Sequence, residues 1–133
     1  MPPRVAKNIA ISLGVVLIVL GLAGFTPNPF VGKEALLETD FWQNVGHAVI
    51  GVYLVGMALT GEGNAAFGLY SSALACILFA GNCYMELGNW SKGYAFNHAV
   101  EITKGSVWFH ASLGAILGVA GTMNTAKRQL FYQ

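Results

Sequence analysis

The sequence predicts an all-α integral membrane protein, a four-helix bundle with up-down topology. The chain is 55% hydrophobic with a mean hydropathy of +0.57. Only 10% of its 133 residues are charged, against roughly 25% in an ordinary soluble domain. Four stretches contain no Asp, Glu, Lys or Arg: 8–32, 41–61, 63–85 and 105–126. Each is long enough for a helix to cross a hydrocarbon core of about 30 Å, and none has the regular polar face of a soluble helix.

The first span is expected at residues 8–25. Arg4 and Lys7 precede it, as basic residues precede a secretion signal. However, the apolar run is longer than a signal core of about 7 to 15 residues, and it ends at a Thr-Pro pair without a clear cleavage site. We therefore expect this segment to be retained as a membrane span.

The second span is expected at residues 41–60, with Thr39 or Asp40 as its N-cap. The third is expected at residues 65–87. A short glycine-rich turn over residues 61–64 would join the two, which predicts that these helices are antiparallel neighbours.

The fourth span is expected at residues 105–122. The connection before it, residues 88–104, contains an uneven apolar stripe between Ala95 and Thr103. This stripe predicts a short helix lying in the membrane interface.

The Lys and Arg residues near the span ends predict the orientation. They favour both termini in the cytoplasm, for a multi-pass protein of a bacterial cytoplasmic (inner) membrane. The residues counted are Arg4, Lys7, Lys127 and Arg128 on the cytoplasmic side and Lys33, Lys92 and Lys104 on the other.

A short motif, His-Ala-x-x-Gly, occurs in both the second and the fourth span. His47 precedes Gly51, and His110 precedes Gly114, by the same spacing. Both spans run from the outside inward, so the two histidines are expected at the same depth. We therefore interpret the chain as two helical hairpins related by a degenerate duplication.

Ionisable residues inside a membrane are costly and usually need a partner. The depth of each residue along its span predicts one polar cluster below the outer surface. Its members would be His47, His110, Asn44, Asn82, Cys83 and Glu86.

Three interpretations of the histidine pair remain open. The histidines could hydrogen-bond across helix contacts and stabilise the packing. They could instead be axial ligands of haem b or another tetrapyrrole, for which Gly51 and Gly114 would leave space. Finally, His47 and His110 could join Cys83 or Glu86 in a copper or zinc site, although no familiar metal-binding spacing is present.

Other function classes find little support. A formal net charge of +1 does not suggest a nucleic-acid partner. No nucleophile elbow, phosphate-binding glycine loop or deeply placed acidic pair is found, so an enzyme is not expected. No span contains a deep charge or a proline break, which argues against an ion path.

Three motifs resemble a family of small four-pass bacterial membrane proteins of unknown function. They are GLAGFTP, NVGHAVIGV and VWFHASLGAILGVAG, in the first, second and fourth spans. The last departs from the family pattern at Val107, where the family has Asn three residues before its histidine. The resemblance implies the fold and a membrane location, but no activity.

The function expected from these observations is that of an accessory or structural subunit of a larger membrane complex. The partners would be the lipid bilayer and other membrane subunits. The alternative is a redox or pigment protein that holds a tetrapyrrole through His47 and His110.

Overall fold

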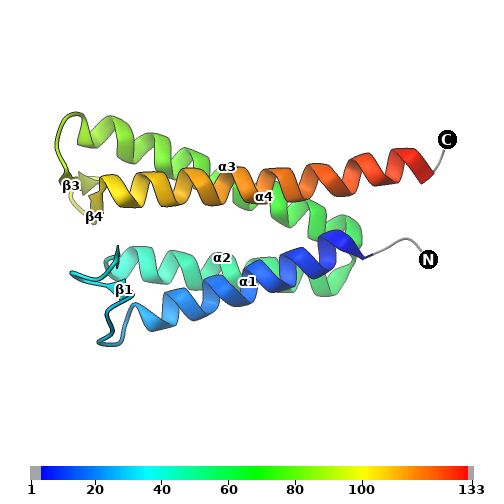
Figure 1. Cartoon of the computed structure of the whole chain (residues 1–133), viewed down its shortest axis with the longest axis horizontal. Helices are drawn as coiled ribbons and strands as arrows, with labels where there is room; N and C mark the ends of the chain where they lie inside the picture. Colours follow the sequence, from blue (N-terminus) through cyan, green and yellow to red (C-terminus); the bar gives the residue numbers. More distant parts are fainter. Residues whose placement is uncertain (1–3, 132–133) are drawn as a thin grey trace.

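The part of the chain that the structure describes is mostly helical, with four α-helices, which confirms the all-α prediction. The computed structural model describes the backbone of residues 4–131 and the side chains of residues 4–122. The helices run up and down along one long axis (Figure 1). In chain order they are α1 (Val5–Ala23), α2 (Phe41–Thr60), α3 (Glu62–Leu87) and α4 (Lys104–Phe131). Each predicted span corresponds to one helix.

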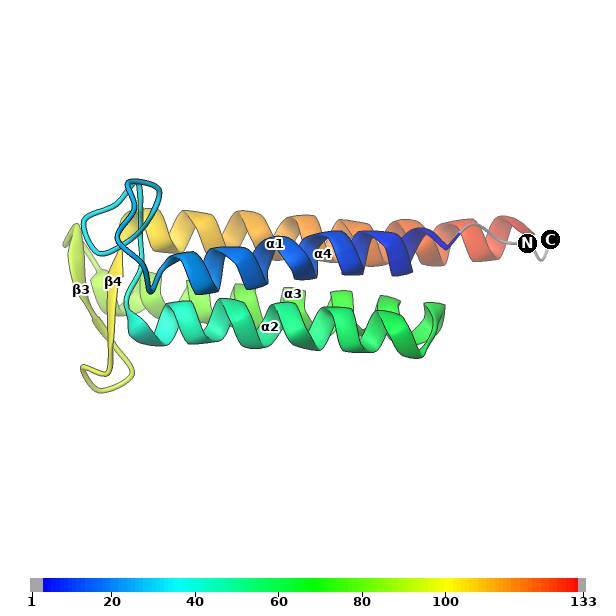
Figure 2. The same ribbon diagram turned by 90° about the horizontal axis from the view of Figure 1, so that it is seen from below.

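The helices are arranged as two hairpins, α1 with α2 and α3 with α4, seen from two sides in Figures 1 and 2. The turn between α2 and α3 is shorter than predicted, because Gly61 alone separates the two helices. Its φ of 146° lies in a region that glycine adopts without a steric cost. One residue is therefore enough to reverse the chain.

Glycines bring α1 and α2 into backbone contact. A Cβ atom added to Gly51 would lie 2.5 Å from the carbonyl oxygen of Gly14. A Cβ atom added to Gly21 would lie 2.6 Å from the carbonyl oxygen of Asn44. Because glycine has no side chain, the two helix backbones can approach closely at these positions.

The main hydrophobic core extends from the middle of the bundle to the end that contains Glu62. Each helix contributes one fully buried leucine to this core: Leu17, Leu54, Leu69 and Leu117. Small buried side chains, mostly alanine, surround these leucines. The core therefore joins the two hairpins from the middle of their length to the end away from the loops.

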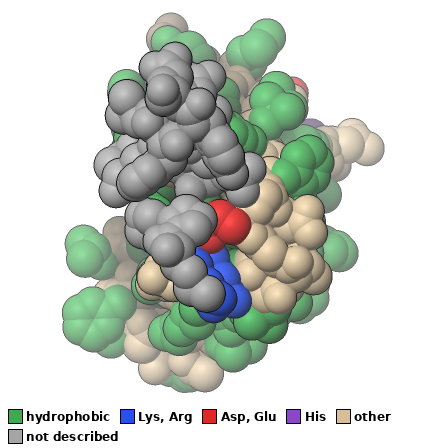
Figure 3. All heavy atoms as spheres, turned by 90° about the vertical axis from the view of Figure 1, so that its right-hand side faces the viewer, with side chains coloured by type: hydrophobic (Ala, Val, Ile, Leu, Met, Phe, Trp, Pro, Cys, Tyr) green, Lys and Arg blue, Asp and Glu red, His purple; other side chains and the backbone are tan. Residues whose placement is uncertain are grey.

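At one end of the bundle, Glu62 joins the first turns of two helices. It is in the first turn of α3, and its carboxylate also accepts hydrogen bonds from the backbone N–H groups of Ala6 (2.7 Å) and Lys7 (3.1 Å) in α1. A carboxylate at a helix N-terminus satisfies free N–H groups and is favoured by the helix dipole. Figure 3 looks onto this end and shows a small charged area among hydrophobic and other side chains.

The opposite end is covered by two loops that contain short strands. In the first loop, β1 (Val31–Gly32) pairs in parallel with β2 (Leu37–Glu38). In the second, β3 (Lys92–Ala95) pairs antiparallel with β4 (Val100–Thr103).

The prediction of a short helix at Ala95–Thr103 is wrong, because this segment belongs to the β3–β4 hairpin. Val100 and Ile102 are buried while Glu101 between them is exposed, which is the alternation of a half-buried strand. The turn residues 96–98 all have positive φ, which a right-handed helix does not allow.

Asp40 connects the start of α2 to this hairpin. It is the N-cap of α2, one of the two predicted candidates: its Oδ1 accepts the Gln43 N–H at 2.9 Å. Its Oδ2 accepts the Glu101 N–H at 2.8 Å.

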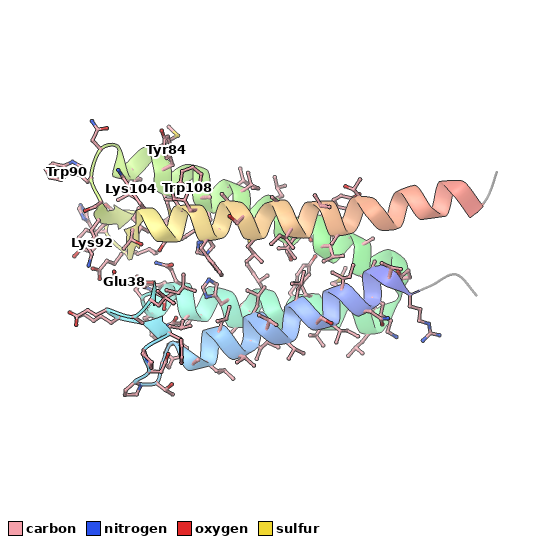
Figure 4. All side chains as sticks on the ribbon, viewed as in Figure 1. Glu38, Tyr84, Trp90, Lys92, Lys104 and Trp108 are labelled. Atoms are coloured by element: carbon pink, nitrogen blue, oxygen red, sulfur yellow. The ribbon has the colours of Figure 1, made fainter. Side chains whose placement is uncertain are left out.

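An exposed ion pair also joins the two loops. The Lys92 ammonium donates to the Glu38 carboxylate at 3.0 Å, and both residues are labelled in Figure 4. This hydrogen bond, and the charge of the carboxylate, raise the pKa of Lys92. The side chains of Lys127 and Arg128, which were counted for the orientation, lie outside the described residues.

Candidate functional site

The two histidines of the repeated motif contact each other. His47 of α2 and His110 of α4 are only 3% and 7% exposed. Their Nε2 atoms lie 3.2 Å apart, which is hydrogen-bonding distance. The two residues therefore lie at one level along the bundle, and the pair links one hairpin to the other.

The surroundings of His110 assign its tautomer. Its Nδ1 lies 2.7 Å from the backbone carbonyl oxygen of Ser106, and a carbonyl only accepts. Nδ1 therefore carries a proton, and in a neutral ring Nε2 is then an acceptor. It follows that the Nε2–H of His47 donates to His110.

This assignment leaves one nitrogen of His47 without a hydrogen bond. Its Nδ1 is buried and has no partner among the described residues. Buried polar atoms are rarely left unpaired. The unpaired nitrogen thus marks a position where a further group would be stabilised.

Two polar residues that the sequence analysis missed extend the pair toward the loops. The hydroxyl of Ser106 donates to Gln43 Oε1 at 3.3 Å. The amide of Gln43 in turn donates to the Glu101 carbonyl at 2.6 Å. Gln43 and Ser106 each precede a histidine by four residues. The Gln43–Ser106 contact therefore lies one helical turn from the contact between the two histidines. That shared spacing is the signal that could have found them.

The correspondence between α2 and α4 extends beyond the histidines. Thr103 Oγ1 accepts the Ser106 N–H at 3.1 Å, as Asp40 accepts the Gln43 N–H. All of the matching positions are separated by the 63 residues that separate the histidines. They are Asp40 and Thr103, Gln43 and Ser106, His47 and His110, Gly51 and Gly114, and Leu54 and Leu117.

Aromatic rings surround the histidine pair. The ring centroid of Phe79 lies 4.5 Å from that of His110. Phe109 contacts both histidines, with centroid distances of 5.6 Å to His47 and 5.2 Å to His110. The pair therefore lies in a largely apolar environment, where a hydrogen bond is strong and an unpaired polar atom is costly.

Other members of the predicted polar cluster lie elsewhere. Cys83 packs in an apolar group with Ile102 and Val107, while Asn82 and Glu86 are exposed. Asn44 is buried, but it accepts a hydrogen bond from the Thr39 hydroxyl at 2.6 Å. His98, the third histidine, is exposed in the β3–β4 turn.

Within the described part of the chain, no group of three or more His, Cys, Asp or Glu side chains is close enough to hold a metal ion. The structure therefore brings His47 and His110 together without adding Cys83 or Glu86 as ligands.

The repeated glycines face the neighbouring helix of their own hairpin. Gly51 lies against Gly14 and Ile18 of α1. Gly114 lies against Ile77 and the Ala73 carbonyl of α3. Close helix packing accounts for both glycines without a ring between α2 and α4.

The geometry of the pair is compatible with a small metal ion. Imidazole nitrogens at about 2.0–2.1 Å from a tetrahedral metal are about 3.3 Å apart, close to the 3.2 Å between the two Nε2 atoms. The Nδ1–H of His110 already donates to a carbonyl, as it commonly does in metal-binding histidines. Axial ligation of a tetrapyrrole would instead need the Nε2 atoms about 4 Å apart.

Comparison with known proteins finds no matching family, no similar curated protein and no similar solved structure. The resemblance to small four-pass membrane proteins stays a prediction.

Proposed function

We propose that this protein is a four-span subunit of a bacterial cytoplasmic membrane complex, with a structural or accessory role. Its apolar helix surface would contact lipid and partner helices. The observation that carries the proposal is the exposure of large apolar side chains along all four helices.

These side chains would be unfavourable in water. Soluble monomers rarely expose contiguous apolar patches of more than a few hundred Å², whereas lipid solvates such surfaces well. Twelve representative side chains are between 48% and 67% exposed: Val15, Val16, Val19 and Leu22 in α1, Val49, Val52 and Leu59 in α2, Phe67, Leu74 and Leu78 in α3, and Ile116 and Val119 in α4.

Helix length and composition support the proposal in part. Among the described residues, two helices are long and apolar enough to cross a membrane, Val5–Ala23 and Glu62–Leu87. The other two, α2 and α4, contain Gln43, His47 and His110, which lower the hydropathy although they are buried between helices. Such inward-facing polar residues are compatible with a membrane span.

The end of the bundle that contains the loops has the composition of a membrane–water interface. Trp42, Trp90 and Trp108 are between 56% and 76% exposed there. Figure 4 labels two of them beside Lys92 and Lys104. Tryptophan is enriched at the headgroup level of membrane proteins.

We further propose that the two hairpins arose by duplication. The matching positions of α2 and α4 support this, because each helix repeats the cap, the polar residue, the histidine, the glycine and the leucine at the same spacing.

Localisation and orientation can be tested by cysteine labelling. In a background of Cys76→Ala and Cys83→Ala, we would compare Ser91→Cys with Asn64→Cys, two exposed positions at opposite ends of the bundle. We expect the protein in the membrane fraction. A membrane-impermeant maleimide should label Ser91→Cys in intact cells and Asn64→Cys only after permeabilisation. Protein in the supernatant of lysed cells without detergent, or labelling of both positions in intact cells, would contradict the proposal.

The subunit role can be tested by extraction in a mild detergent followed by native electrophoresis. We expect the chain to migrate with a larger complex that contains other membrane proteins. A lone monomer in native membranes would rule out the accessory role while leaving the membrane location intact.

The histidine pair supports a second candidate function, binding of a transition-metal ion or, after rearrangement, a tetrapyrrole. The specific observation is that two buried Nε2 atoms converge beside an unpaired Nδ1. Incubation of the purified protein with Zn²⁺, Cu⁺ or haem should then give bound metal or a Soret band. His47→Ala and His110→Ala should each abolish this binding, whereas the control His98→Asn should retain it. A colourless, metal-free protein would contradict this candidate.

A further inference from the structure

The ligands that the histidine pair offers to an ion are neutral. They are the Nε2 atoms of His47 and His110, which lie 3.2 Å apart. Carboxylates at this end of the bundle have other partners: Asp40 uses both oxygens for backbone N–H groups, and Glu38 pairs with Lys92. In the part of the chain whose side chains are described, no third His, Cys, Asp or Glu completes a metal-binding group. An ion held by the pair would therefore have two uncharged nitrogen ligands and no anionic one.

The surroundings of the pair favour an ion of low charge. Both histidines are more than nine-tenths buried, and the rings of Phe79 and Phe109 contact them. The cost of moving an ion from water into such an environment rises with the square of its charge, so it is about four times larger for a divalent ion than for a monovalent one. Neutral ligands do not offset this difference as carboxylates or thiolates would. Aromatic faces also attract a cation.

The number of ligands separates the candidate ions further. Zn²⁺ in proteins is almost always four-coordinate, so at this pair two of its ligands would have to be water in apolar surroundings. Copper accepts imidazole ligands, and Cu⁺ forms stable complexes with only two or three neutral donors. Two nitrogens at about 2.0 Å from such an ion lie about 3.5 to 4 Å apart. A small rotation of either imidazole ring would widen the present 3.2 Å to that distance.

The unpaired nitrogen of His47 allows its Nε2 to become a ligand without the loss of a proton. In the metal-free pair, the Nε2–H of His47 donates to His110, and its Nδ1 has no partner among the described residues. If the proton moves to Nδ1, the lone pair of Nε2 is free for the ion. The Gln43 carbonyl precedes His47 by four residues, as the Ser106 carbonyl that accepts the Nδ1–H of His110 precedes that residue. It is therefore the expected acceptor for the moved proton.

We propose that the histidine pair binds one Cu⁺ ion through the Nε2 atoms of His47 and His110. The proposal rests on the metal-binding candidate above and specifies the ion. Two copper–nitrogen bonds replace the hydrogen bond between the rings, and the proton of His47 passes from Nε2 to Nδ1. No proton leaves the protein and no electron is transferred. The bound ion links α2 to α4, and thus one hairpin to the other.

Metal retention by the full chain in detergent tests the proposal. The purified protein would be loaded with Cu⁺ under ascorbate and nitrogen, or with Zn²⁺, then desalted, and the metal counted by elemental analysis. We expect one Cu⁺ per chain and no stoichiometric Zn²⁺. The variants His47→Gln and His110→Gln should each lose the copper, whereas His98→Asn should retain it. The double variant Cys76→Ala/Cys83→Ala should also retain it, which matters because thiols are the other strong ligands for Cu⁺.

Two measurements on the unsubstituted protein guard against variants that misfold. X-ray absorption at the copper edge should show nitrogen neighbours and no sulfur. Copper should also raise the temperature of thermal unfolding, because it binds only the folded pair. A sulfur neighbour, or loss of copper from the cysteine variant, would overturn the proposal. Retention of Zn²⁺ as strong as that of Cu⁺ would overturn the choice of ion but leave the metal-binding candidate standing. Retention of neither metal would overturn both.

Discussion

Replacing Gly51 with alanine is expected to destabilise the protein by about 2 kcal/mol. The new methyl carbon would lie 2.5 Å from the Gly14 carbonyl oxygen, 2.7 Å from Ile18 Cγ1 and 2.8 Å from the Ile18 nitrogen. Two of these three atoms are backbone, so no rotamer change can relieve the contact. The helices α1 and α2 would have to separate and lose the packing between them.

The control is Gly56→Ala in the same helix. A Cβ atom there would meet nothing within 4 Å. Alanine favours a helix over glycine by about 1 kcal/mol in water-soluble hosts, so this variant should be as stable as the wild type or slightly more stable. The free energy of unfolding in mixed micelles, followed by circular dichroism, measures both. If Gly51→Ala proved as stable as Gly56→Ala, the backbone contact between α1 and α2 would be refuted.

The second large effect is expected at the histidine pair. His110→Leu would leave the Nε2–H of His47 buried without an acceptor, and His47→Leu would leave the Nε2 of His110 without a donor. An unpaired buried polar group costs about 1–3 kcal/mol. Each single variant is therefore expected to lose stability in that range.

The double variant His47→Leu/His110→Leu should cost less than the sum of the two single changes, because it leaves neither nitrogen unpaired. The resulting coupling energy should be about 1 kcal/mol, as for hydrogen bonds measured between helices of membrane proteins. Ser112→Ala, at an exposed position of the same helix, should change stability by less than about 0.5 kcal/mol. Strictly additive losses would mean that the two histidines act independently and do not share a hydrogen bond.

The glycine contact and the histidine pair show what sequence patterns can predict and what they cannot. The motif His-Ala-x-x-Gly located both histidines, because residues at the same distance from a helix start lie at the same depth. Depth does not determine the direction in which a side chain points. Cys83 was expected beside the histidines, but it faces the β3–β4 hairpin, and Glu86, one turn further along, is exposed.

The sequence did not point to Gln43 and Ser106 as members of the site, for a related reason. Gln43 and Ser106 are ordinary polar residues near a helix start, where many such side chains are solvated. Their importance follows from the loops, because Gln43 donates to the Glu101 carbonyl in β4. That strand was itself mistaken for a helix, since Ala95–Thr103 is too short for helical and strand periods to be separated clearly.

The sequence by itself left the N-cap of α2 open between Thr39 and Asp40. It determined four helices, the approximate ends of all but α4, which continues to Phe131, and the common level of the histidines along their helices. These properties depend on local composition and on distance along a helix axis. Only the tertiary structure decided which helix faces meet and how Gly14 opposes Gly51. The physical reason is that these helices are apolar on nearly every side. Hydrophobicity then favours no single inward face, and backbone contacts and a few buried hydrogen bonds select how each helix is rotated.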